Sequence, residues 1–188
     1  SIRRGASGMA SPVLAACITG NRPFVELLLE AGGKLVHEYP VFEPGADFSK
    51  PPARVHRASP ALFAAVRRAP ADFVSWLPDH CGLDLHMTDL NGETLLHKAA
   101  EEGNLPVARL LVQRGISPNT TSYHTPPLHV AARRKHTAVA EFLLQAGADA
   151  QAEGPGGNAL DELLFYGGDA ATEALLTAAG AKPSPRES

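Results

Sequence analysis

The chain has 188 residues, of which 44% are hydrophobic, 20% are charged and 6% are aromatic, and its formal net charge is −3. This composition is typical of a folded protein, and the sequence contains no run of about 18 apolar residues that could insert into a membrane. The charge gives no general basic field for binding nucleic acid, and two cysteines are too few for a disulfide scaffold.

The first predicted element is a pair of short helices over residues 11–33. Ser11-Pro12 supplies an N-cap and a first-turn residue that needs no N–H, and small residues follow it. The second helix carries an apolar stripe and ends at Gly32, a typical left-handed terminator. Cys17 occupies a small-residue position of the first helix, so we expect it to be a buried free thiol.

Residues 34–57 interrupt the helical pattern. Four prolines exclude a helix there, and residues 35–42 are predicted to form a short extended stretch. The segment also carries three aromatic side chains, those of Tyr39, Phe42 and Phe48. Two alternatives are open: the rings bind a partner as a projecting finger, or they fold back and cover the first helix pair.

Helix pairs with the same pattern are then expected at 59–82, 93–115, 126–147 and 158–181. The segments Leu96-His97-Lys98-Ala99-Ala100 and Leu128-His129-Val130-Ala131-Ala132 begin two of them 32 residues apart, and a glycine follows each outer helix. In the second pair, Pro70 and Pro78 predict a distorted outer helix that ends around Leu77. The last pair is degenerate, as a terminal unit should be, and residues 183–188 are expected to form a flexible tail.

These units resemble the ankyrin repeat, whose pattern is T-P-L-H-x-A-A at a period near 33. The resemblance covers nearly the whole chain and implies an all-α solenoid of about five stacked helix-turn-helix units with projecting turns. It places residues 1–188 in one domain, with the 34–57 insertion between repeats one and two. In this family the imidazole at the His97 and His129 positions hydrogen-bonds the adjoining turn, which implies a structural role rather than catalysis.

The resemblance also indicates a binding surface, because the residues after the Ala-Ala pair point into the concave groove of the family. Turn tips add further contacts to it. The expected partner-binding residues are therefore Arg67, Arg68, Leu90, Glu101, Glu102, Tyr123, Arg133, Arg134, Phe165 and Tyr166. The alternative is that the arginines and glutamates pair across repeats as solvated ion pairs, each contributing only about 0.2–1 kcal/mol. Arginine and aromatic residues are enriched in interface hot spots, which favours a surface that binds a protein.

No catalytic motif occurs in the sequence. The cluster His80, Cys81, Asp84 and His86 matches no standard zinc spacing, and the titratable residues of the insertion have no catalytic pattern. We therefore expect no cofactor, no metal and no small-molecule substrate, and neither nucleic acid nor membrane insertion.

The expected function is that of a non-catalytic protein-interaction module acting as a scaffold or adaptor. Three alternatives are open: a dedicated inhibitor or immunity protein, a bacterial effector delivered into a host, or the recognition domain of a larger enzyme. The chain begins without the hydrophobic run of a signal peptide. We expect a cytoplasmic location, or delivery into a host cytosol, and a native targeting sequence need not lie within these residues.

Overall fold

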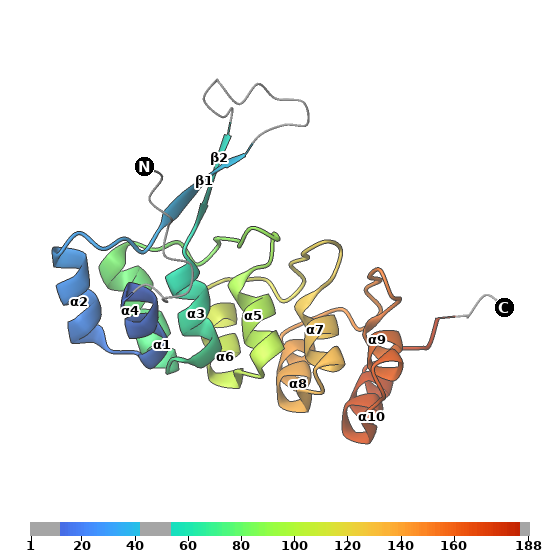
Figure 1. Cartoon of the computed structure of the whole chain (residues 1–188). Coiled ribbons are helices and arrows are strands. Elements are labelled where there is room, and N and C mark those ends of the chain that lie inside the picture. The colour runs from blue at the N-terminus through green and yellow to red at the C-terminus, as the bar shows by residue number, and fades with distance from the viewer. Residues whose placement is uncertain (1–11, 42–53, 185–188) are drawn as a thin grey trace.

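The computed structural model describes residues 12–41 and 54–184 of the chain. The described residues form ten α-helices, which are stacked in a row, and two β-strands, which project from it (Figure 1). In chain order they are α1 Pro12–Thr19, α2 Arg22–Glu30, β1 His37–Val41, β2 Arg54–Ala58, α3 Pro60–Arg68, α4 Ala71–Cys81, α5 Leu95–Glu102, α6 Leu105–Gln113, α7 Pro127–Arg133, α8 Thr137–Gln145, α9 Ala159–Phe165 and α10 Ala170–Ala178. None of these described helices is long and apolar enough to cross a bilayer.

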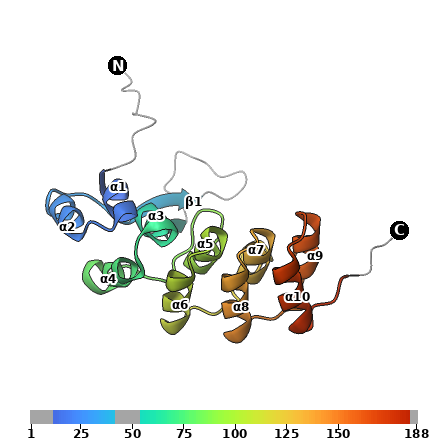
Figure 2. The same ribbon diagram turned by 90° about the horizontal axis from the view of Figure 1, so that it is seen from below.

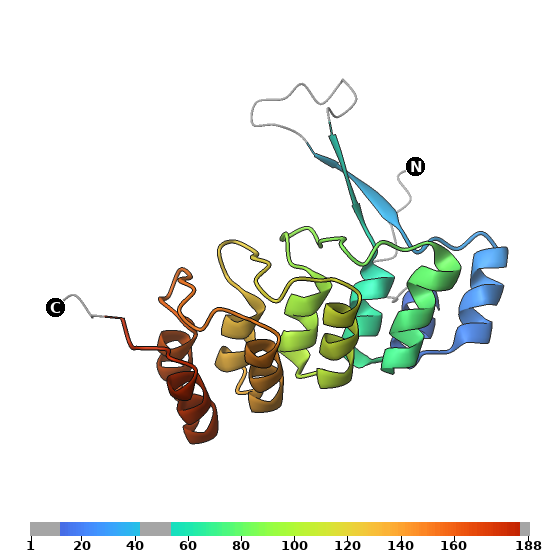
Figure 3. The same cartoon turned by 180° about the vertical axis from the view of Figure 1, so that it is seen from behind.

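The helices form two layers, which are separated clearly in Figure 2. The odd-numbered helices α1, α3, α5, α7 and α9 make the inner layer, and each packs against the next. In the outer layer, α4, α6, α8 and α10 pack in the same order, and the view from behind shows the same succession (Figure 3). The predicted all-α solenoid of stacked helix pairs is confirmed.

The core runs through the whole stack between the two layers. It consists largely of leucine, valine and alanine side chains, and it extends without a break from Val13 to Ala181. Buried alanines such as Ala65 and Ala100 let neighbouring inner helices approach closely, because they add almost no width. A single helix pair could not bury both of its apolar faces, so stacking stabilises every unit.

Local sequence explains most helix boundaries. Side-chain oxygens of Asn21, Ser59 and Asn104 accept hydrogen bonds from backbone N–H groups in the first turns of their helices. Every outer helix is followed by a glycine in the left-handed region, as predicted: Gly32, Gly82, Gly115, Gly147 and Gly180.

The prediction that the outer helix of the second pair ends around Leu77 is wrong. Helix α4 continues through Pro78 to Cys81. Proline lacks one N–H and costs about 3 kcal/mol inside a helix, but other contacts hold this last turn. The Gly82 N–H donates to the Pro78 carbonyl at 3.1 Å, and the His80 ring stacks on Trp76 with centroids 5.1 Å apart.

Strands β1 and β2 form an antiparallel hairpin that projects from the side of the inter-repeat turns (Figure 1). The extended stretch predicted for residues 35–42 contains β1, whereas its pairing with β2 was not predicted. At the base of the hairpin, the Ser59 hydroxyl donates to the Leu35 carbonyl at 2.5 Å. The two ends of the insertion therefore meet, and the helix pairs on either side remain adjacent.

Candidate protein-binding surface

An ion-pair row links the C-terminal ends of α3, α5 and α7 to the first turn of α9. It is made of Arg67, Glu101, Glu102, Arg133, Arg134 and Glu162. The Arg67 Nε donates to Glu102 Oε1 at 2.6 Å, and Arg134 Nη2 donates to Glu101 Oε1 at 2.6 Å. Arg133 Nη1 lies 3.5 Å from Glu162 Oε2 on the following repeat. Pairing across repeats, one of the alternatives drawn from the sequence, is therefore present. The free energy is small for the pairs of Arg67 and Arg134, whose side chains are half-exposed.

The ion-pair row brings together five of the predicted binding residues but not Arg68. The Arg68 side chain is exposed and makes no ion pair within the part of the chain that the structure describes. Burial raises the pKa of Glu101, but the hydrogen bond from Arg134 and the charges of Lys98, Arg134 and Arg67 outweigh it, so the pKa is lowered. Glu101 is accordingly charged at neutral pH.

Lys98 is a central residue of this surface that the sequence analysis missed. Its ammonium group contacts the Glu93 carboxylate and lies 3.6 Å from both Asp89 Oδ2 and Glu101 Oε2. Burial lowers the Lys98 pKa, but the hydrogen bond to Glu93 and the three carboxylates together raise it. The only available signal in the sequence was the presence of Glu93 and Glu101 within five positions of Lys98.

An exposed aromatic pair, Phe165 and Tyr166, lies at the last repeat. Phe165 is 80% exposed and Tyr166 52%, and their rings meet edge to face with centroids 5.1 Å apart. The Arg133 guanidinium carbon lies 5.8 Å from the Tyr166 ring centroid, so the pair continues the ion-pair row. A hollow of about 310 Å³ beside the pair is lined by these rings together with Pro155, Gly156 and Glu162.

The two predicted turn tips are also exposed, Leu90 at 61% and Tyr123 at 72%. Tyr123 and His124 both have left-handed backbones, with φ of 45° and 64°. At the corresponding positions 32 residues earlier the chain has Asn91-Gly92, where only the glycine has a left-handed backbone, with φ of 71°. Two left-handed non-glycine residues in one turn store strain, which is typical of functional positions.

His97 and His129 have the structural role that the family resemblance implies. The His97 Nδ1 accepts from the Thr94 N–H, so its Nε2–H donates to the Thr125 carbonyl, at 2.9 Å. The His129 Nε2 makes the equivalent bond to the Gly157 carbonyl at 3.2 Å. Burial is the largest influence on both imidazoles and lowers their pKa values.

Both cysteines are free thiols, and Cys17 is buried as predicted. Burial, with a smaller contribution from the nearby Cys81, raises the pKa of Cys17 to about 11. Over residues 12–41 and 54–184, no three or more His, Cys, Asp or Glu side chains form a group that could hold a metal ion.

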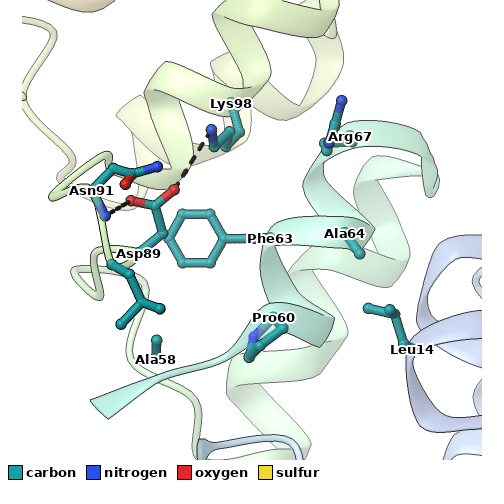
Figure 4. A pocket seen from close by; sticks show the side chains of 10 residues that line it. Leu14, Ala58, Pro60, Phe63, Ala64, Arg67, Asp89, Asn91 and Lys98 are labelled. Carbon is teal, nitrogen blue, oxygen red and sulfur yellow. Dashed lines mark hydrogen bonds and ion pairs between the residues drawn. The ribbon is translucent and has the colours of Figure 1, made fainter. Parts of the chain in front are cut away.

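A cavity of about 400 Å³, here called the base cavity, lies where the hairpin meets the stack (Figure 4). One face of α3 supplies Phe63, whose ring points across the cavity toward the turn at Asp89. The other walls come from separate segments: Leu14 of α1, Ala58 of β2 and Leu90 of the turn. Of its apolar wall residues, the sequence indicated only Leu90, because the others become neighbours only in the folded stack.

The remaining predicted contacts belong to the insertion. Tyr39 lies in β1, opposite His56 of β2. Phe42 and Phe48 lie outside the described residues. The choice between a binding finger and a cover for the first helix pair therefore stays open.

Comparison with known proteins gives matches to repeat segments. The model of the family described as "Ankyrin repeats (3 copies)" matches residues 62–154. The chain is 38% identical over 65 residues to Alpha-latrotoxin-Lt1a of Latrodectus tredecimguttatus, covering 34% of this chain and 5% of the toxin. It is 40% identical over 75 residues to the Nuclear factor NF-kappa-B p105 subunit of Gallus gallus, and the match covers 38% of this chain and 8% of that protein. It is 35% identical over 107 residues to Rabankyrin-5 of Homo sapiens, and the match covers 50% of this chain and 9% of that protein. In each case the match spans less than a tenth of the relative's own length.

Proposed function

Over residues 62–154 the chain belongs to the ankyrin-repeat family, and from this premise we propose that its inner face binds a protein partner. Ankyrin repeats are generally protein-interaction modules. The chain would act as a non-catalytic scaffold or adaptor in the cytoplasm, with residues 1–188 forming a single binding domain.

The observation that carries this proposal is the exposed aromatic pair. Leaving two large rings exposed to water forgoes the free energy that burying them would give. Tyrosine and arginine dominate interface hot spots, and here Arg133 lies against Tyr166. The ion-pair row adjoins the pair and supplies the polar rim that surrounds such anchors.

A second candidate is that these repeats are the recognition part of a larger protein. It is supported by the comparisons, because the matched segments make up only 5% to 9% of the relatives described above. The inhibitor and effector alternatives have no comparable observation in their favour.

The test is an affinity capture with the double variant Phe165→Ala and Tyr166→Ala. We expect at least a tenfold loss of the proteins that the wild-type chain captures from its native source, measured by quantitative mass spectrometry. The melting temperature should stay within about 2 °C, since the rings are exposed and surface substitutions change stability little.

The matched control is Phe24→Ala, which removes an exposed ring from α2 in the outer layer. It should leave capture unchanged. Equal capture by the double variant and the wild type would contradict the proposal. A large fall in melting temperature would instead show that the two rings stabilise the fold.

A further inference from the structure

The hairpin has two different edges, and the register shows why. Five consecutive pairs run from His37–Ala58 to Val41–Arg54, and Pro40 faces Val55. Proline has no N–H to exchange with its partner, so Pro40–Val55 must be a non-hydrogen-bonded pair. Pairs of the two kinds alternate in an antiparallel sheet, so Glu38–Arg57 is also non-hydrogen-bonded.

In such pairs the N–H and C=O groups point away from the partner strand. On β1 the outer edge therefore offers Glu38 and Pro40, and the proline removes one donor and blocks regular pairing. On β2 the outer edge offers complete N–H and C=O groups at Val55 and Arg57. No third strand pairs with either edge among the described residues. Only β2 therefore presents an edge that can accept another strand.

The accepting edge leads directly to the base cavity. Ala58, the last residue of β2, lines the cavity, and so do Pro60 and Phe63 of the helix that follows, α3 (Figure 4). At its base β2 lies on the side of the α5 turn, while β1 lies on the side of α1 and α2 (Figures 1 and 3). Residues directly opposite one another in a sheet share a face. A residue added opposite Ala58 would thus direct its side chain into the cavity.

The chemistry of the cavity specifies that side chain. Leu14, Phe63 and Leu90 give it apolar walls, and its volume of about 400 Å³ accommodates a leucine, methionine or phenylalanine side chain. The charges at its rim are already satisfied within the chain. Arg67 pairs with Glu102, and Lys98 contacts three carboxylates. A charged group entering the cavity would find no free counter-ion there, whereas an uncharged apolar group fits.

From these observations we infer that β2 and the base cavity together bind an extended segment of the protein partner. The segment adds a strand to β2 through the backbone groups of Val55 and Arg57 and places one large apolar side chain in the cavity. This inference rests on the proposed function and names the chemical class of the ligand.

The test uses a displayed library of random twelve-residue peptides, selected on the wild-type chain and then measured on four variants. Val55→Pro removes an outward N–H from β2, and Glu38→Pro makes the matched change on the edge of β1. Leu90→Ala removes an apolar wall of the cavity, and Leu27→Ala removes an equally exposed leucine from α2. We expect the selected peptides to lose affinity at least tenfold with Val55→Pro and Leu90→Ala, and to keep it with the two control variants.

Amide exchange on the wild-type chain provides a readout that does not depend on any variant folding. The Val55 and Arg57 amides should exchange fast in the free chain and at least tenfold more slowly with a selected peptide bound. The outward amide of Glu38 should exchange fast in both states.

Three results would overturn the inference: selected peptides that bind Val55→Pro like the wild type, unchanged exchange at Val55 and Arg57, or a library without binders. The proposed function is tested separately, by capture with the Phe165 and Tyr166 double variant. Capture that depends on those rings, together with peptides insensitive to Val55→Pro, would retain the protein-binding function and reject the β2 site.

Discussion

At the scale of single residues, the turn at Tyr123 and His124 has a strained backbone, because both residues are left-handed. The residues on either side, Ser122 and Thr125, exchange backbone hydrogen bonds of 3.1 and 2.8 Å, which hold the turn in its left-handed form. The His97 imidazole also holds this turn, because its Nε2–H donates a hydrogen bond to the Thr125 carbonyl. The strained backbone therefore places the Tyr123 ring at a defined and exposed position.

We predict that replacing Tyr123-His124 by Asn-Gly stabilises the chain and weakens partner binding. Non-glycine residues in this region cost on the order of 1–3 kcal/mol each, and Asn-Gly is the preferred sequence for such a turn. Urea unfolding should show a gain of at least about 1 kcal/mol. His124→Gly alone is the control, since it relieves strain but keeps the Tyr123 ring, and it should stabilise without loss of affinity. Equal affinity for both variants would show that Tyr123 makes no contact.

The buried His97 predicts a dependence of stability on pH. Burial lowers its pKa in the folded chain, against smaller opposing effects of the Thr125 carbonyl and the Glu93 and Asp89 carboxylates, while Lys98 lowers it further. Below about pH 6.5, His97 becomes protonated in the unfolded chain but stays neutral in the folded chain. Its contribution to the free energy of unfolding is therefore fully present above that pH and is lost as the pH decreases. The buried His129, whose pKa is also lowered by burial, contributes to the fall in the same direction.

We therefore predict that the melting temperature falls between pH 7.5 and 5.5, and that His97→Leu reduces this fall. In the preceding repeat, the position that corresponds to His97 is occupied by the buried Leu62, so a leucine fits at this position of a repeat. At pH 7.5 the variant should be less stable by about 1–2 kcal/mol, because it loses the hydrogen bonds to Thr94 and Thr125. Scanning calorimetry of both proteins at the two pH values measures the difference. An identical fall in both would mean that other groups carry the pH dependence.

At the scale of elements, the hairpin is an addition to the repeats rather than a part of their packing. The side chains of Glu38 and Arg57 are exposed, and the nitrogen Arg57 Nε lies 3.7 Å from Glu38 Oε1 in a pair of little energetic weight. The buried contacts at its base belong to Leu35 and Ala58. The stability of the stack should therefore depend on this base and not on the projecting part.

We predict that replacing residues 38–57 by Asn-Gly leaves the solenoid folded. The shortened loop keeps the His37–Ala58 pair and the bond from Ser59 to Leu35, so the two repeats remain in register. The melting temperature should change by no more than about 3 °C, and the selected strand peptides should no longer bind. Unfolding of the first helix pair, detected by amide exchange in α1 and α2, would favour the alternative in which the insertion covers that pair.

At the scale of the whole molecule, the repeat made much of the fold predictable. Helix pairs, their closing glycines and the role of His97 depend on short patterns that recur, so each copy supports the others. Pairing of Arg67 with Glu102 and of Arg134 with Glu101 could be foreseen because these residues occupy the same slots of adjacent units. The features that could not be predicted depend on contacts between distant segments.

Three examples show this limit. The last turn of α4 continues past Pro78, where the His80 ring stacks on Trp76 and the Gly82 N–H donates to the Pro78 carbonyl. The partner of β1 is separated from it by residues 42–53, so no local pattern identified β2. The base cavity joins residues 14, 58–67 and 89–98 from three repeats, and only the stacking of the repeats brings them together.

The closed base of the insertion has an evolutionary consequence. Because Leu35 and Ser59 lie within one hydrogen bond of each other, sequence can be gained or lost between them while the repeat period on either side is preserved. The entropy cost of a longer loop grows only with the logarithm of its length. This junction is thus a permissive point at which new recognition segments can be grafted, so specificity can diversify here while the repeats stay under selection for stacking.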